Sequence, residues 1–180
     1  MAVRQPFCYP NKSRRSSAGA VRGRPRPAAA SSRLLLLLWA VWLSVVLATN
    51  VVDGCKALGL LGEGWVFASG NYRFLAETTA RYGTPAWVNG VLFLGVVCWE
   101  GLAALLFWAA FARGPSRRGS LYAAFIASLT LWGAFLVADE VCIAYPVEAT
   151  HLRLLTAQLV TLLAIELLPQ RGTHDLQPRP

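Results

Sequence analysis

Long apolar runs separated by short polar segments dominate the pattern of hydrophobic and polar positions along this chain. Residues 34–52 carry no charge. At 1.5 Å per residue a helix of that length is about 28 Å long, close to the hydrocarbon thickness of a bilayer. Two further runs cover 86–112, where Glu100 is the only charge, and 121–138, which has none. A fourth, weaker run covers 151–168, with Arg153 placed to reach the lipid headgroups. The pattern predicts four membrane-spanning helices.

Composition argues against a soluble protein. Hydrophobic residues make up 56% of the 180 positions and charged residues only 14%, with a mean hydropathy of +0.46. Soluble domains carry about a quarter charged residues. Four apolar helices in so short a chain would leave too little polar surface to cover them in water. We therefore predict an all-α fold, a four-helix transmembrane bundle over residues 34–168, followed by a short polar tail over 169–180.

The first 33 residues differ from the rest of the chain. They contain no Asp or Glu and are rich in Arg, Ser, Ala, Pro and Gly. Such a segment buries too little apolar surface to offset its ordering entropy, so we predict a disordered basic leader over 1–33. Three interpretations stay open: a basic tail attracted to anionic lipid, an organellar transit peptide, and an upstream start that is not used.

The distribution of positive charge predicts the topology. Most of the 17 Lys and Arg residues lie in the leader, in the segment 113–118 and in the C-terminal tail. Short loops rich in Lys and Arg stay on the cytoplasmic side of a membrane. Both termini are therefore expected on the cytoplasmic side, or on the matrix or stromal side of an organelle. The bacterial inner membrane is the first expectation, and an organellar membrane the second if the leader is a transit peptide.

The loop over 53–85 is long for a bundle of this size. Glycines interrupt its apolar residues, and it contains aromatic side chains at Trp65, Phe67, Tyr72 and Phe74. Aromatic residues favour the membrane–water interface. Two interpretations stay open, an interfacial segment along the outer leaflet and an ordinary extramembrane loop.

Glu100 is the most informative single residue. A charged group near the centre of a span costs at least a few kcal/mol, so Glu100 is expected to face the bundle interior, protonated or paired. A functional interpretation makes it a proton relay, a cation site or a contact to a partner subunit. A structural interpretation makes it a protonated carboxyl bonded to a neighbouring helix, for example to Thr130, Gln158 or Thr161.

Other polar residues gather where the spans end opposite the basic segments: Asn50, Asp53, Asn89, Asp139, Glu140, His151 and Arg153. Opposite charges there predict a rim of ion pairs, with Arg153 bonded to Glu140 or to Asp53. Cys55 and Cys142 lie just beyond span ends on the same side, so a disulfide between them is expected if that side is oxidising.

The residues exclude several kinds of chemistry. The chain has no zinc-ligand spacing, no Gly-rich phosphate loop and no Ser/His/Asp set, so we expect no metal, no cofactor and no catalytic residues. The basic leader adjoins a span and lacks a folded reader, which argues against a nucleic-acid partner. The expected partners are the lipid bilayer and either another membrane subunit or a second copy of the chain.

Several motifs together resemble a known family. They are TNVVD at 49–53, the aromatic loop, CWEGLAALLFW at 98–108 and the acid that ends the third span. This set resembles the bacterial family described as predicted small integral membrane protein, a four-span domain of unknown function. The resemblance covers about residues 34–168, and the Trp99-Glu100 pair is its most specific element. It implies a compact helical membrane protein and no assigned activity.

Two functional hypotheses follow. The first is a non-catalytic structural or accessory membrane component, in which the intramembrane polar residues set helix packing or partner choice. The second is a small transporter or a proton- or ion-conducting component that uses Glu100. Replacing Glu100 by Gln distinguishes them, because Gln keeps the hydrogen-bonding shape and removes the titratable proton.

Overall fold

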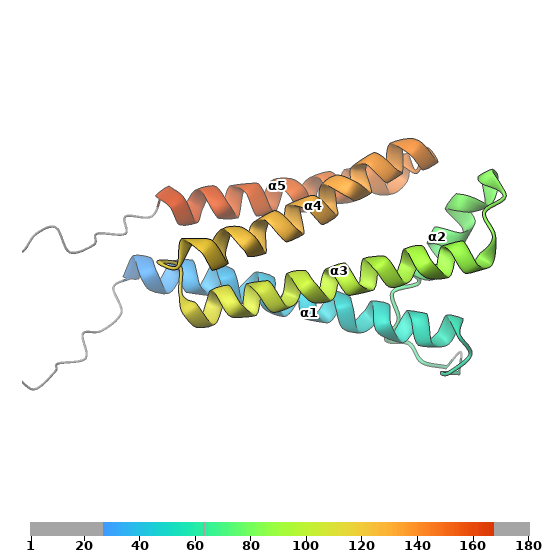
Figure 1. Ribbon diagram of the computed structural model, residues 1–180, viewed down its shortest axis with the longest axis horizontal. Helices are drawn as coiled ribbons and strands as arrows, with labels where there is room; N and C mark the ends of the chain where they lie inside the picture. The colour runs from blue at the N-terminus through green and yellow to red at the C-terminus, as the bar shows by residue number, and fades with distance from the viewer. Residues whose placement is uncertain (1–26, 63, 168–180) are drawn as a thin grey trace, which may run out of the picture.

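The computed structural model describes residues 27–62 and 64–167, and over these residues the protein is all-helical (Figure 1). The α-helices, with a 3-10 turn (η1) after the second, are α1 (Pro27–Ala57), α2 (Asn71–Thr79), η1 (Ala80–Tyr82), α3 (Ala86–Arg113), α4 (Arg118–Cys142) and α5 (Tyr145–Leu167). No strand occurs within the described ranges. The predicted all-α fold is confirmed. The predicted tail over 169–180, and residues 1–26 of the predicted leader, lie outside the described residues.

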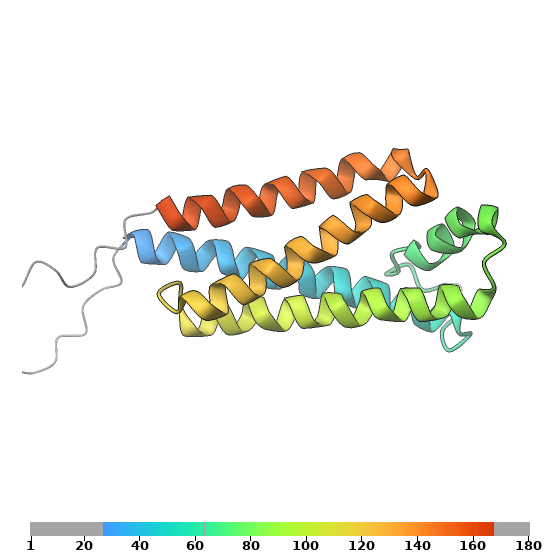
Figure 2. The ribbon, with the colours of Figure 1, turned by 45° about the horizontal axis from the view of Figure 1, so that its top comes forward.

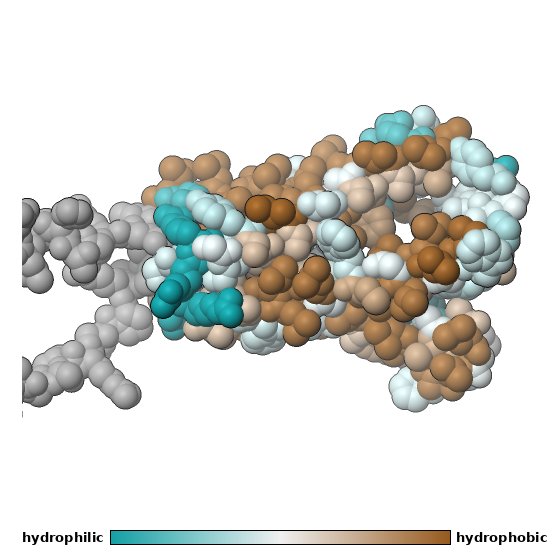
Figure 3. Space-filling model, viewed as in Figure 1, coloured by the Kyte–Doolittle hydropathy of each residue, from teal (hydrophilic) through white to brown (hydrophobic). Residues whose placement is uncertain are grey.

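Helices α1, α3, α4 and α5 are long and apolar enough to cross a membrane. Each covers the described residues of one of the four runs predicted from the sequence. Large apolar side chains remain exposed on all of them, including Leu34, Leu105, Ile126 and Leu163. Figure 3 shows a broad apolar surface over the bundle, next to one strongly hydrophilic end. Monomeric soluble proteins rarely expose so much contiguous apolar surface, and the fold is compatible with a multi-pass integral membrane protein.

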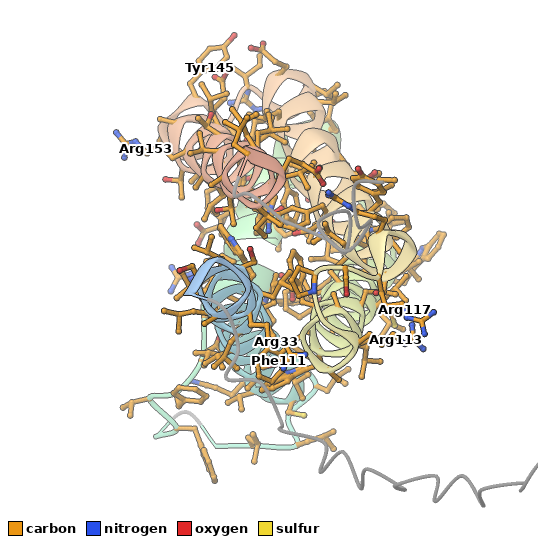
Figure 4. All side chains as sticks on the ribbon, turned by 90° about the vertical axis from the view of Figure 1, so that its left-hand side faces the viewer. Arg33, Phe111, Arg113, Arg117, Tyr145 and Arg153 are labelled. Atoms are coloured by element: carbon orange, nitrogen blue, oxygen red, sulfur yellow. The ribbon has the colours of Figure 1, made fainter. Side chains whose placement is uncertain are left out.

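The long helices form two antiparallel pairs, α1 with α3 and α4 with α5, and the contact between α3 and α4 joins the pairs. Helix α1 packs along α3, α4 packs along α5, and α3 also packs against α4, whereas α1 and α5 touch only slightly. The start of α1, the α3–α4 connection and the end of α5 all lie at one end of the bundle (Figure 2). We call this the basic end, because Arg33, Arg113, Arg117 and Arg118 lie there. Seen from this end, Arg113 and Arg117 point away from the bundle (Figure 4), while Arg118 pairs with Glu166 on α5.

The spans are longer than the apolar runs that predicted them. Helix α1 begins at Pro27 rather than at residue 34, so the predicted disorder over 27–33 is wrong. Proline fixes a helical φ at a first helical position, and the Ala residues that follow are the best helix formers. Helix α4 continues to Cys142, where Ile143 takes a left-handed conformation and the Ala144 N–H bonds the Asp139 carbonyl at 2.7 Å.

The interior is tightly packed in the half nearer the basic end. Side chains with 0–1% exposure from all four long helices meet there: Leu36, Phe107, Leu121, Phe125 and Ile165. The rings of Phe107 and Phe125 contact edge to face, with centroids 5.0 Å apart. Ala124 and Ser128, one turn apart on α4 and both fully buried, let the neighbouring helices approach closely.

Helix α2 is the element that the sequence did not predict. It lies inside the loop over 53–85 and packs against both α1 and α3. Gly70, with a φ of 76°, precedes its first residue, and the ring of Tyr72 meets the ring of Phe93 edge to face at 5.4 Å. Trp65 and Phe67, which precede α2, are exposed. The α2 part of the loop is therefore folded onto the bundle. The position of the loop at a membrane interface stays a prediction.

Candidate functional site

The two helix pairs enclose a cavity of about 640 Å³ in the half of the bundle away from the basic end. Figure 3 shows the surface hollowed at that end. All four long helices and α2 contribute to its walls. Its aromatic side chains are Trp42, Phe74, Phe93, Trp132 and Phe135. Its hydrogen-bonding and charged side chains include Asn50, Asn71, Glu100, Asp139 and His151.

Glu100 lies on α3 and is only 2% exposed. Its two carboxyl oxygens both accept from Asn50 Nδ2 on α1, at 2.8 and 2.7 Å. Asn50 Oδ1 in turn accepts from Asn71 Nδ2 at the start of α2, at 2.8 Å. The three side chains therefore form one hydrogen-bonded chain across three helices. Polar contacts between membrane helices contribute about 0.6 to 2 kcal/mol each.

Asp53 attaches the start of α2 to α1. Its Oδ2 accepts from the Tyr72 backbone N–H at 2.8 Å and from Ser69 Oγ at 3.1 Å. Tyr72 is in the first turn of α2, where backbone N–H groups have no partner inside the helix and a negative charge is stabilising. At the other end of α2, Thr79 Oγ1 donates to Asn89 Oδ1 on α3 at 2.8 Å. Asp53 and Asn89 are thus anchors for α2 at the cavity wall.

Asp139 and His151 form the second polar group of the cavity. Nδ1 of His151 on α5 lies 2.6 Å from Asp139 Oδ2 on α4. The imidazole is stacked on Phe135, with centroids 4.8 Å apart, and more loosely on Trp132 at 6.2 Å. The contact joins α4 to α5 close to the point where the two helices connect.

Hydrogen bonds between buried and half-buried side chains lie between the cavity and the basic end. Gln158 Nε2 donates to Ser128 Oγ at 2.6 Å, and Trp39 Nε1 donates to Thr161 Oγ1 at 3.1 Å. Two buried polar atoms, Trp132 Nε1 and Gln158 Oε1, have no hydrogen-bond partner within the described part of the chain. Beyond this layer lies the packed half of the bundle.

The structure brings some of the predicted site residues together and separates others. Asn50 and Glu100 are in direct contact. The interior position of Glu100 agrees with the sequence, but its partner is Asn50 on α1 and not Thr130, Gln158 or Thr161. Thr130 is exposed, and the other two bond elsewhere.

The predicted rim of ion pairs involving Arg153 is wrong. Arg153 and Glu140 are both exposed, and Figure 4 shows Arg153 pointing away from the bundle. Asp53 uses its carboxylate on Ser69 and Tyr72 instead. Arg153 lies on the outer face of α5, where its charge is solvated at less cost than inside the bundle.

The predicted disulfide does not form in the structure, where Cys55 and Cys142 are both free. Cys142 belongs to the α4–α5 pair and lines the cavity, whereas Cys55 belongs to the α1–α3 pair. The separation of the two pairs at this end accounts for the difference.

Comparison of the chain with protein-family models, with curated proteins and with solved structures gives no match in any of the three. The resemblance to the predicted small integral membrane protein family therefore stays a prediction.

Sequence reasoning missed Ser69, Asn71 and Thr79 as members of the site. All three lie in or beside α2, a helix of nine residues that is far too short to be recognised as a membrane span. The polar side chains of the site do not assemble into a metal site. Within 27–62 and 64–167, no group of three or more His, Cys, Asp or Glu residues is placed to hold a metal ion.

Proposed function

We propose that the protein is a non-catalytic structural or accessory component of a membrane. The observation that carries this proposal is the closed inner end of the cavity. Side chains with 0–1% exposure fill the bundle from that point toward the basic end. A conducting protein needs a polar path along its whole length. Among the described residues of the packed half, the buried side chains are mostly apolar, and the buried polar side chains Gln158 and Ser128 bond each other.

The polar groups of the cavity also fit a role other than catalysis. In the described residues, His151 has Asp139 as its only hydrogen-bonding partner, so the pair has no hydroxyl or thiol nucleophile bonded to it. Asn50, Glu100 and Asn71 join three helices, and Asp53 and Asn89 hold α2. These contacts support a role in fixing the arrangement of the helices.

A small proton- or ion-conducting component is the second candidate. The observation that favours it is Glu100, a carboxyl group on a cavity wall inside a span with no cation beside it among the described residues. Conduction through this group would require the packed half of the bundle to open.

Reconstitution into liposomes separates the two candidates. Purified full-length protein and the Glu100→Gln variant are compared under an imposed pH gradient, with a fluorescent dye reporting the internal pH. The accessory role predicts that both proteins insert and that neither dissipates the gradient faster than empty liposomes. A flux in the wild type that Glu100→Gln abolishes would contradict the accessory role and establish the second candidate.

The proposed topology places both termini on the cytoplasmic, matrix or stromal side. The clustering of Arg33, Arg113 and Arg117 at one end (Figure 4) supports this orientation. A membrane-impermeant thiol reagent applied to intact cells should leave a Ser116→Cys variant unmodified at that position. Cys55, at the opposite end of α1, is the built-in control and should react. Modification at position 116 in sealed cells would contradict the orientation.

The proposed partners are the surrounding lipid and either another membrane subunit or a second copy of this chain. The exposed apolar faces of the four long helices support contact with lipid or with another span. Purification in mild detergent, followed by identification of the proteins that remain bound, tests for a subunit. A monomer without companions would argue against one.

A further inference from the structure

The cavity contains a buried carboxyl group without a cation. None of its lining residues is Lys or Arg within the described ranges. Glu100 receives hydrogen bonds from a single amide nitrogen, Asn50 Nδ2, shared between its two oxygens. A carboxylate offers about four lone-pair sites, so most of its accepting capacity is unused. An ionised carboxylate in an interior of low dielectric is stabilised by a cation placed next to it.

The hydrogen bonds around Glu100 orient it as an acceptor. Asn71 Nδ2 donates to Asn50 Oδ1. This bond fixes the orientation of the Asn50 amide, so that its Nδ2 group points to Glu100. Both Glu100 oxygens therefore face a donor. This arrangement suits a carboxylate, which accepts at both oxygens.

The other acidic group of the cavity already has a partner. Asp139 bonds His151, a side chain that can itself carry a positive charge. Asp53, behind the start of α2, is occupied by Ser69 and Tyr72. Glu100 is the carboxyl group that remains for a ligand.

Aromatic rings from α1 and α4 line the same cavity as Glu100. Trp42 and Trp132 have ring centroids 5.9 Å apart, and Trp132 and Phe135 have centroids 5.7 Å apart. All three rings line the cavity. The face of an aromatic ring attracts a cation, with Trp the strongest, and clusters of such rings recognise quaternary ammonium groups. The same rings provide apolar surface for the body of a ligand.

We propose that this cavity binds an organic cation with an apolar body. The cationic group lies against Glu100, and the body lies against the aromatic wall of Trp42, Trp132 and Phe135. The cavity volume of about 640 Å³ falls within the range of small-molecule sites. This ligand site goes beyond the accessory role and is tested by equilibrium binding, independently of the flux measurement.

Tetraphenylphosphonium is a suitable probe, because it combines a positive charge with an aromatic body. Tetraphenylborate has nearly the same shape and the opposite charge. Both are titrated against full-length protein in phosphatidylglycerol nanodiscs, with empty nanodiscs subtracted. We expect saturable binding of tetraphenylphosphonium and no saturable binding of tetraphenylborate. Equal saturable binding of the two ions would overturn the proposal.

Matched variants locate the site. Glu100→Gln should raise the Kd for tetraphenylphosphonium by at least about tenfold, the ratio that corresponds to 1.4 kcal/mol. Glu140→Gln removes one negative charge from the exposed surface at the same end of the molecule and should leave the Kd unchanged. Trp132→Leu should weaken binding several-fold, whereas Trp87→Leu, at a 72% exposed position, should not. A Kd unaffected by Glu100→Gln would overturn the site.

A measurement on the unaltered chain covers the case in which Glu100→Gln does not fold. Cys142 lines the cavity and Cys55 does not. Saturating tetraphenylphosphonium should slow alkylation of the Cys142 thiol several-fold and leave the Cys55 rate unchanged, as measured by peptide mass spectrometry. Equal rates at Cys142 with and without the cation would overturn the proposal.

The same cationic chemistry occurs in two sources, a free amphipathic amine and the ammonium headgroup of a bilayer lipid. Replacing a lipid without an ammonium headgroup by phosphatidylcholine, at a constant fraction of phosphatidylglycerol, distinguishes them, because the surface charge then stays the same. A headgroup that occupies the site would compete and raise the Kd for tetraphenylphosphonium. An unchanged Kd identifies a free cation. This comparison identifies the source of the cation, and the variants above test the site itself.

Discussion

The two halves of this bundle are built on different principles. Near the basic end, the four long helices fill their interior with apolar side chains such as Leu36, Phe107 and Phe125. Toward the other end, the helix pairs separate around a cavity whose walls carry Glu100, Asp139 and their partners. Close packing specifies which helices are neighbours, and directional hydrogen bonds hold the separated half in one arrangement. The contrast assigns stability mainly to the first half and ligand chemistry to the second.

The largest expected effect comes from breaking the packed half. Phe107→Ala removes a fully buried ring that contacts Phe125, and it should lower the free energy of unfolding by about 3–5 kcal/mol. Phe74→Ala is the matched control, because Phe74 lines the cavity and is 40% exposed. Unfolding by denaturant in mixed micelles measures both. Similar losses for the two variants would contradict the division into a packed half and an open half.

The second effect concerns the hydrogen-bonded chain in the open half. Asn50→Leu leaves the buried Glu100 carboxyl without its donor, and it should cost about 2–3 kcal/mol of unfolding free energy. Adding Glu100→Leu should restore most of the loss, because replacing both partners by apolar groups can be nearly neutral. The double-mutant cycle is measured in the same micelles. Losses that simply add would contradict a direct interaction between the two residues.

The sequence predicted the spans better than it predicted the site, for a physical reason. An apolar run is a local property of the chain, and the described residues of each of the four runs lie in a long helix. The helices nevertheless extend past the runs at several ends. Their termini are set by hydrogen bonds, by the positive φ of Gly114 and by the left-handed conformation of Ile143, which hydropathy does not register.

The pairing of Asn50 with Glu100 depends on how α1 and α3 are aligned along their lengths. In sequence, Glu100 is central in its run and Asn50 is near the end of its run, which suggested different depths. Because α1 continues to Ala57, Asn50 is inside the helix and faces Glu100. Helix α2 was missed because its nine residues are too few for a membrane span and because Asp53 and Asn89 hold it through tertiary contacts.

A smaller effect is expected at the second polar group. His151→Phe keeps an aromatic ring next to Phe135 and removes the bond to Asp139. The unpaired Asp139 should cost about 1–2 kcal/mol of unfolding free energy. Arg153→Leu, two residues further along α5 at an exposed position, is the control and should change the unfolding free energy little. Equal effects would mean that the Asp139–His151 contact does not hold α4 to α5.

The smallest effect is expected on the outer surface of α2, where Arg73 and Glu77 form an i,i+4 pair with side chains 85% and 62% exposed. The hydrogen bond that Arg73 Nε donates to Glu77, followed by the negative charge of Glu77, raises the pKa of Arg73, yet water and salt screen such a pair. Arg73→Ala should therefore leave the thermal stability of the protein and the protection of the α2 amides from hydrogen exchange unchanged. Asp53→Ala should instead expose those amides, because Asp53 bonds the Tyr72 N–H at the start of the helix. If Arg73→Ala exposed the α2 amides as fully as Asp53→Ala, the outer Arg73–Glu77 pair would hold the helix as strongly as Asp53 does. The structural role that we assign to the polar wall of the cavity would then be wrong.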